Sequence, residues 1–159
     1  RCMTLLLRQQ PVASDLRFIS AAMKVVTDVE RIGDHAADIA EIVPHLAGVR
    51  KAGDPAVSRS IEMGRKAHKM LQDAMSAFAA EDEVAAKAVI DADDAVDYDF
   101  NTIKRMLAAE IAADSGKVDA ALDVLMVIKY LERIGDHAVN IAEWVEFLRT
   151  GRYHHEKMF

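Results

Sequence analysis

The chain has 159 residues, enough for one domain or two small bundles, and a net charge of −6 at pH 7. This acidic balance argues against a nucleic-acid-binding protein, which would carry a basic stripe. Cys2 is the single cysteine, which excludes an internal disulfide and a cysteine-based zinc site. No apolar run reaches the length of a membrane span and no signal peptide is visible, so we expect a soluble, cytoplasmic protein.

The composition predicts an all-α protein, because Ala, Leu, Val, Ile and Met dominate and only three prolines interrupt the chain. Residues 3–8 are typical of the end of a helix, which Pro11 breaks. Residues 12–43 predict a first long helix with Ser14 as its candidate cap, followed by a loop over 44–53.

Three further helices with short connections are predicted at 55–80, 83–114 and 117–148. Asp54 followed by Pro55 is a strong start signal for the first of them, and Gly151 is a stop signal for the last. His68 lies on the apolar seam of the first and is expected to be packed and hydrogen-bonded. The tail at 153–156, with its paired histidines, is expected to be frayed.

One heptapeptide occurs twice in this chain. Glu-Arg-Ile-Gly-Asp-His-Ala occupies residues 30–36 and returns at residues 132–138, and both copies continue into Ile-Ala-Glu. In the register of this repeat, residues 54–159 form a complete antiparallel three-helix unit with a tail. Residues 1–53 match only the end of its second helix and its third. We therefore expect a partial first repeat, and the start at Arg1 suggests that a preceding segment is absent.

Each copy places a glutamate and an aspartate on one edge of its helix: Glu30 and Asp34 in the first, Glu132 and Asp136 in the second. A row of acids beside a core face is repulsive unless cations compensate it. One interpretation is a solvated face paired with the neighbouring arginines. The duplication of the motif favours the other interpretation, a cation site.

The repeat also places Gly33 and Gly135 inside helices, where glycine costs about 1 kcal/mol relative to alanine. Close packing against a neighbouring backbone would explain them. His35 and His137 follow each aspartate directly but point about 100° away from it. We therefore expect both histidines to support the ligands or to lie on the surface, not to bind metal.

A second pair of acids is predicted to face the second copy. Asp93 occupies a place in the 83–114 helix where an apolar side chain is expected, and Asp97 lies one turn on. If the chain bends near Ser115, Asp93 and Asp97 lie level with Asp136 and Glu132, roughly 25–33 Å from the bend. Four converging carboxylates suit magnesium, calcium, manganese or iron. The spacing of four argues against a ferritin-type oxidase, which uses Glu-x-x-His.

The chain resembles the PhoU family, the regulators of bacterial phosphate uptake. The resemblance rests on both Glu-Arg-Ile-Gly-Asp copies, on Asp93-x-x-x-Asp97, and on Arg-Gln-Gln-Pro-Val-Ala-Ser-Asp-Leu-Arg at residues 8–17. It covers nearly the whole chain. The sequence departs from the family pattern in the extra glutamine of Arg-Gln-Gln-Pro and in the missing N-terminal helices.

The resemblance implies two tandem three-helix bundles related by a pseudo-twofold axis, with multinuclear metal clusters on Glu/Asp-x-x-x-Asp motifs. It assigns one complete site and one further motif to Asp93, Asp97, Glu132, Asp136, Glu30 and Asp34. Iron is the first expectation for the metal, with magnesium, manganese, zinc or nickel as alternatives. The implied role is non-enzymatic: restraint of the phosphate ABC transporter, through its ATPase subunit, and of the phosphate-sensing histidine kinase. The membrane is approached only through these partners.

Two other interpretations stay open. The acids could serve a metal-dependent hydrolase or oxidase, although no nucleophile or general base is evident, or the chain could be a purely structural module. The partial first repeat leads to two expectations. Glu30 and Asp34 form half a site that is empty, weakly occupied or completed by another chain, and the exposed apolar stripe of the first long helix makes the protein a homo-oligomer.

Overall fold

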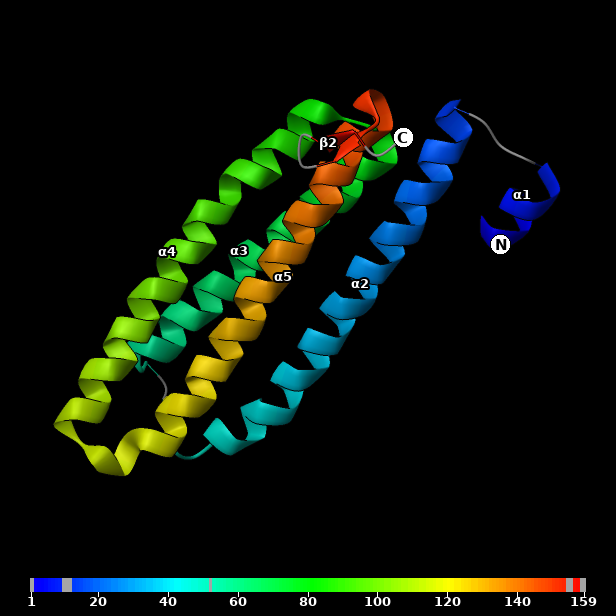
Figure 1. Cartoon of the computed structure of the whole chain (residues 1–159). Helices are drawn as coiled ribbons and strands as arrows, with labels where there is room; N and C mark the ends of the chain where they lie inside the picture. The colour runs from blue at the N-terminus through cyan, green and yellow to red at the C-terminus, as the bar shows by residue number, and fades with distance from the viewer. Residues whose placement is uncertain (1, 10–12, 52, 154–155, 158–159) are drawn as a thin grey trace.

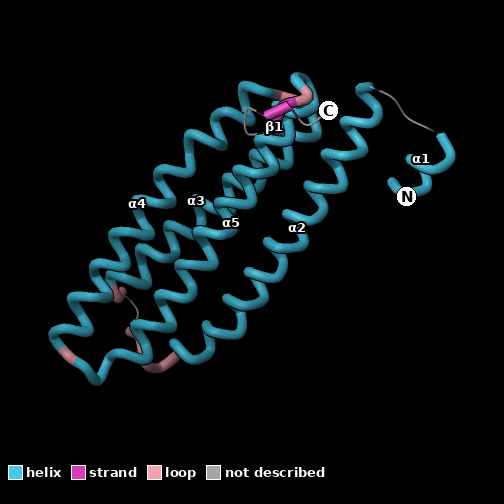
Figure 2. Tube along the Cα trace, in the orientation of Figure 1, coloured by secondary structure: helices cyan, strands magenta, loops and turns pink. Residues whose placement is uncertain are grey.

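The computed structural model describes residues 2–9, 13–51, 53–153 and 156–157 and shows an all-α fold (Figure 1, Figure 2). The helices are α1 (Cys2–Gln9), α2 (Ala13–Leu46), α3 (Pro55–Ala80), α4 (Glu83–Ala113), the 3₁₀ turn η1 (Ser115–Lys117) and α5 (Val118–Thr150). Two-residue strands β1 (Arg152–Tyr153) and β2 (Glu156–Lys157) pair in antiparallel fashion near the end of the chain. In the part of the chain that the structure describes, no helix combines the length and the hydropathy of a membrane span.

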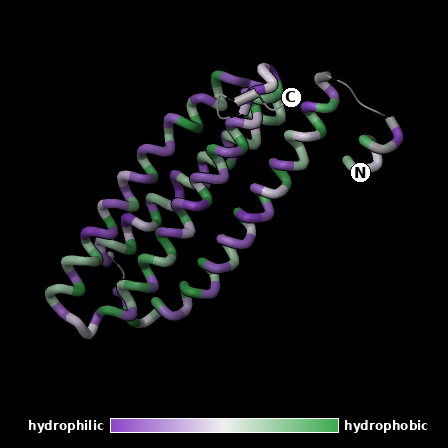
Figure 3. Tube along the Cα trace, viewed as in Figure 1, coloured by the Kyte–Doolittle hydropathy of each residue, from purple (hydrophilic) through white to green (hydrophobic). Residues whose placement is uncertain are grey.

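Helices α3, α4 and α5 form an antiparallel three-helix bundle in which each helix packs against the other two (Figure 1). Figure 3 shows hydrophobic and hydrophilic residues mixed along the helices, as amphipathic helices require. The largest fully buried side chains are Phe147, Met63, Ile103, Ile128, Ile141, Val96, Val124 and Val145. Burial of these apolar stripes is the main force that holds the bundle together.

Local signals place the turns of this bundle. The Asp54 carboxylate caps α3 by accepting hydrogen bonds from two backbone N–H groups of the first turn, at 2.8 and 3.3 Å, and Pro55 takes the first helical position. Glu81 ends α3 with a left-handed φ of 52°, and Asp82 caps α4. Gly151 ends α5 with a φ of 70°, which favours glycine.

Helix α2 runs antiparallel to α5 and packs along it (Figure 1). Near one end, Arg17 Nε donates to the Leu148 carbonyl oxygen at 3.1 Å. Nearer the middle, His137 Nδ1 lies 2.8 Å from an Asp28 carboxylate oxygen. Among the described elements, α1 contacts only α2. The division into a partial repeat over 1–53 and a complete one over 54–159 stays a prediction.

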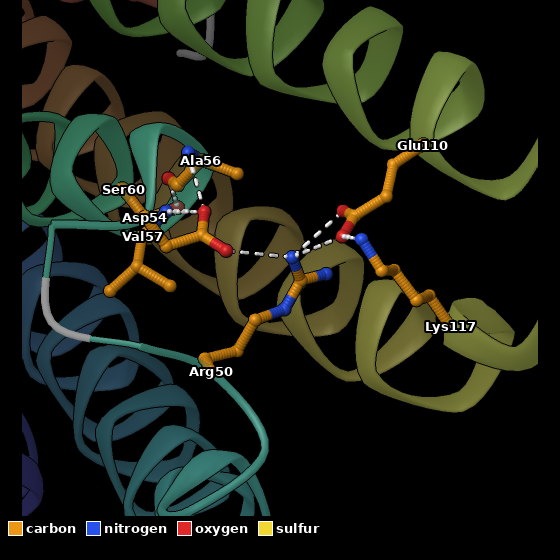
Figure 4. Close-up of polar contacts among 7 residues, drawn as sticks. All are labelled: Arg50, Asp54, Ala56, Val57, Ser60, Glu110 and Lys117. Atoms are coloured by element: carbon orange, nitrogen blue, oxygen red, sulfur yellow. Dashed lines mark hydrogen bonds and ion pairs between the residues drawn. The ribbon is translucent and has the colours of Figure 1, made fainter. Parts of the chain in front are cut away.

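A buried arginine fastens the connection between α2 and α3 (Figure 4). The Arg50 side chain is 6% exposed, and its Nη1 donates to Asp54 at 2.9 Å and to both carboxylate oxygens of Glu110 at 2.9 and 2.7 Å. Lys117 adds an ion pair to Glu110 at 3.5 Å. These charge-assisted bonds tie the connection to the start of α3 and the end of α4.

Three local predictions in this part of the chain were wrong. Helix α2 continues through Pro44 and ends at Leu46, although the proline has no N–H to donate to the carbonyl of Ala40. Ser14 lies inside α2, which begins at Ala13, and so it is not the cap. His68 is exposed rather than packed, because it borders a hollow that α2, α3 and α5 leave open.

The tail is more ordered than expected. The Tyr153 ring stacks on the buried Trp144 ring, with centroids 4.0 Å apart and planes at 13°. The strand pair β1–β2 includes Glu156, so the expectation of fraying is wrong for the described part of the tail. Trp144 supplies the aromatic surface on which the tail folds back. The paired histidines at 154–155 lie outside the described residues.

Candidate metal centre

The four acids of the predicted complete site come together across the α4–α5 hairpin, whose bend lies at η1. Asp93 on α4 is within electrostatic reach of Asp97 on its own helix and of Asp136 and Glu132 on α5. Partial burial, followed by the repulsion of these carboxylates, raises the pKa of Asp93 to about 6. The sequence predicted that Asp93 and Asp97 lie at the same distance from the bend as Asp136 and Glu132. In the structure, these acids of α4 and α5 do lie close enough to repel one another.

Asp136 is affected by the same group of charges. Loss of surrounding water between the helices, and then the charge of Glu132, raise the pKa of Asp136, although the residue as a whole remains exposed. Asp97 adds to this effect, whereas Lys129 and Arg133 oppose it. Acids that raise one another's pKa favour a shared cation, because a cation relieves their repulsion.

Gly135 on α5 lies directly beside Asp93, one of the four acids of the candidate site. A Cβ atom at position 135 would lie 3.2 Å from Asp93 Oδ1 and 3.6 Å from Val96 Cγ1. The missing side chain leaves room for the Asp93 carboxylate beside the α5 backbone. The predicted close packing is thus confirmed at Gly135, but against side chains and not a neighbouring backbone. It is wrong at Gly33, where a Cβ would meet nothing within 4 Å.

The four carboxylates do not yet form a closed shell. Among the described residues, no three carboxylate, imidazole or thiol groups are gathered closely enough to enclose an ion. Glu132 instead forms an ion pair with Lys129, three residues before it on α5. To surround a cation, the four carboxylates would have to move closer together, and Glu132 would have to leave Lys129.

The residues present fit a divalent metal. All four donors are carboxylates, the hard oxygen ligands that magnesium, manganese and iron accept. The absence of a side chain at Gly135 lets the Asp93 carboxylate lie against α5, and the raised pKa of Asp93 favours a cation that would relieve the repulsion among the acids. Asp93, Asp97, Glu132 and Asp136 are therefore the side chains that would hold it.

The first copy of the motif is arranged differently. Glu30 and Asp34 are exposed on α2, and Asp34 pairs with Arg31 at 3.4 Å. In the part of the chain that the structure describes, no acids join them in a group of three. Their role as half of a second site stays a prediction.

The two histidines of the repeat meet at the α2–α5 interface. The His35 and His137 rings stack with centroids 5.6 Å apart, and His35 also stacks on Tyr130 at 5.5 Å. His137 contacts Asp28, which occupies in the first copy the position of Tyr130 in the second. The two contacts therefore join equivalent pairs of positions in the two copies of the repeat. Both side chains are less than one-fifth exposed, so the surface alternative of the prediction is wrong, while a supporting role for the histidines stays a prediction.

Comparison with known proteins decides the family. The family model described as PhoU domain matches residues 1–43 and 61–145. The chain belongs to the PhoU family. It is 39% identical over 149 residues to the phosphate-specific transport system accessory protein PhoU homolog of Clostridium acetobutylicum, covering 93% of this chain and 67% of that protein. It is 39% identical over 152 residues to the homolog from Pseudomonas aeruginosa, covering 94% of this chain and 62% of that protein.

Solved PhoU structures show the same fold. The crystal structure of PhoU from Pseudomonas aeruginosa matches with a TM-score of 0.88 and 38% identity, covering 95% of this chain and 72% of that one. PhoU from Streptococcus pneumoniae matches with a TM-score of 0.85 and 30% identity, covering 96% and 70%. The resemblance seen in the doubled motif is thus confirmed. The chain spans about two-thirds or less of the curated PhoU relatives that it matches.

Sequence reasoning missed three charged residues of this framework. Asp99 is 3% exposed and is held by Arg59 and Lys66 of α3. Lys129 neutralises one acid of the candidate site, and Asp28 pairs with His137. The spacing Lys129-x-x-Glu132 is visible in the sequence, whereas the other two pairings cross between helices and carry no local signal.

The two repeat glycines give a paired prediction. Gly33→Ala should stabilise the protein by about 0.5–1 kcal/mol, because the methyl group meets nothing and alanine favours the helix. Gly135→Ala should lack that gain, because the Asp93 carboxylate must move, and it should also weaken divalent-cation binding. Urea unfolding and calorimetric titration measure both effects. Equal stabilisation by both changes, with cation affinity unaltered, would contradict the role given to Gly135.

Proposed function

We propose that this PhoU chain is a metal-binding, non-enzymatic regulator of bacterial phosphate uptake that works in the cytoplasm. In this role it restrains the phosphate ABC transporter through its ATPase subunit, and restrains the phosphate-sensing histidine kinase and the transcription that the kinase controls. The convergence of four carboxylates across the α4–α5 hairpin is the observation that carries the metal-binding part. The names of the curated relatives, accessory proteins of the phosphate-specific transport system, support the transporter part.

The proposed cofactor is a multinuclear cluster of divalent or trivalent cations, with iron first. Carboxylate ligands bind iron, manganese and magnesium and leave room for bridging between two ions. When bound, the cluster would supply the positive charge that the acids lack. The protein's part is to hold the four carboxylates of α4 and α5 level with one another along the hairpin.

Self-association forms part of the proposal. Met23, Val26 and Val29 lie at three-residue spacing on α2 and are 39%, 66% and 41% exposed. Neighbouring apolar side chains on one helix face favour association over exposure to water. Val26→Glu should therefore shift the protein towards the monomer in light scattering at micromolar concentration. A monodisperse monomer before any substitution would count against this part.

The regulatory role can be tested by uptake of radiolabelled phosphate. Cells that lack their own accessory protein should take up less phosphate, at high external phosphate, when they express the full chain. The Asp93→Asn, Glu132→Gln double variant should restrain uptake less. Unchanged uptake on expression of the chain would contradict the proposal. Phosphatase or oxidase activity that tracks metal content would instead favour the enzyme interpretation.

A further inference from the structure

A lysine side chain already provides a positive charge at the candidate metal centre. Lys129 lies on α5, one turn before Glu132, and its ammonium group contacts the Glu132 carboxylate. The same ammonium lies 5.3 Å from the centroid of the Phe100 ring on α4. The Lys129 charge therefore sits between the two helices that supply the four acids.

No other cation in the described residues pairs with these acids. The ion pairs found there include none on Asp93, Asp97 or Asp136, and Lys129 alone pairs with Glu132. Glu132 is only 16% exposed, whereas Lys129 is 40% exposed. The Glu132 carboxylate is thus mostly enclosed, while the Lys129 ammonium has a route to water if a cation replaces it.

The first copy of the repeat lacks this lysine. Thr27 stands there in place of Lys129, and Glu30 has no ion pair among the described contacts. Arg31 pairs instead with Asp34. The ammonium is therefore confined to the copy of the motif that has four facing acids, which points to a function in that site.

We propose that Lys129 is a tethered counter-ion that a divalent cation must displace from Glu132, so that this lysine sets how tightly the centre binds metal. This inference rests on the proposed metal-binding function. A group that binds the free state lowers the apparent affinity for its competitor. A solvated ion pair is worth up to about 1 kcal/mol, so its removal should strengthen binding about three- to fivefold. In water the released ammonium can keep its contact with the Phe100 ring.

Lys129→Met and Lys104→Met form a matched pair for the test. Lys104 lies over the same Phe100 ring, at 5.2 Å, but pairs with none of the four acids among the described contacts. Isothermal titration of the full chain with Mn²⁺ should show about three- to fivefold tighter binding by Lys129→Met. Lys104→Met should stay within about twofold of the unchanged protein, and Lys129→Arg should restore affinity close to it.

A second readout does not depend on bound metal. Without metal, Lys129→Met should melt at a lower temperature than Lys104→Met, because the acids lose their counter-ion. If the unchanged protein binds Mn²⁺ and Lys129→Met binds it equally or more weakly, the counter-ion role is wrong while the metal site stands. If neither protein binds Mn²⁺, Fe²⁺ or Mg²⁺, the proposed metal-binding function fails, and this inference fails with it.

Discussion

Asp93→Asn should make the metal-free protein more stable at pH 7 while abolishing its response to divalent cations. The pKa of Asp93, about 6, lies above the ordinary 3.8, so the folded chain holds this proton more tightly than the unfolded chain does. The associated stability is fully present below about pH 3.8 and is lost as the pH rises through about 6. Asparagine carries no charge at any of these pH values, so the variant does not lose this stability. Its free energy of unfolding at pH 7 should be roughly 1–2 kcal/mol higher than that of the unchanged protein.

The same substitution removes a ligand, so its two effects have opposite signs. At a metal concentration 100 times the dissociation constant, binding should stabilise the unchanged protein by about 2.7 kcal/mol, and the variant by little. Urea unfolding between pH 3.5 and 7.5, with and without Mn²⁺, measures both. The stability of the variant should match that of the unchanged protein near pH 3.5 and exceed it at pH 7.

Asp94→Asn is the control for this experiment. Asp94 is exposed on α4 and contributes to the repulsion that raises the pKa of Asp93, but it is not among the four facing acids. Asp94→Asn should raise the free energy of unfolding at pH 7 by less than Asp93→Asn does, and the variant should still be stabilised by Mn²⁺. If Asp94→Asn and Asp93→Asn behaved alike in both measurements, general charge and not a site would explain the result.

The second large effect concerns the buried Asp99. Its carboxylate is 4% exposed and accepts from Arg59 Nε at 3.1 Å and from Lys66 Nζ at 2.6 Å. Replacing both cations with methionine leaves a buried charge without a partner, which should cost about 3–5 kcal/mol. Chemical denaturation of the double variant measures this cost.

Asp99→Asn should cost distinctly less than the loss of both cations. Arg59 and Lys66 are 38% and 44% exposed, so either can turn to water when the carboxylate is gone. The amide can still accept a hydrogen bond in the same place. If Asp99→Asn lowered the free energy of unfolding as much as the double variant or more, the expected difference between losing the carboxylate and losing its two cations would be contradicted.

Much of the fold could be predicted, because the signals are local. Helix periodicity, the Asp54-Pro55 start and the bends near Glu81 and Ser115 are confirmed within a few residues. The prediction that the acids of α4 and α5 face one another followed from the fixed rise per residue of a helix and from the short connection between the two helices. Such arithmetic works only for helices that neighbour each other along the chain.

Predictions about contacts between distant helices were weaker for the same reason. On α4, Asp99 precedes the aromatic residue Phe100, and hydrophobicity alone would give Phe100 the deeper position in the core. The structure buries Asp99 more deeply, because Arg59 and Lys66 on α3 reach it. The placement of His35 and His137 likewise depends on α2 lying against α5, which no local pattern specifies.

Anomalous diffraction from crystals soaked in Mn²⁺ would locate bound metal in the fold. We expect one or more manganese peaks between α4 and α5, bounded by carboxylates of Asp93, Asp97, Glu132 and Asp136, with Glu132 turned away from Lys129. Strong peaks elsewhere, and none between these helices, would contradict this expectation.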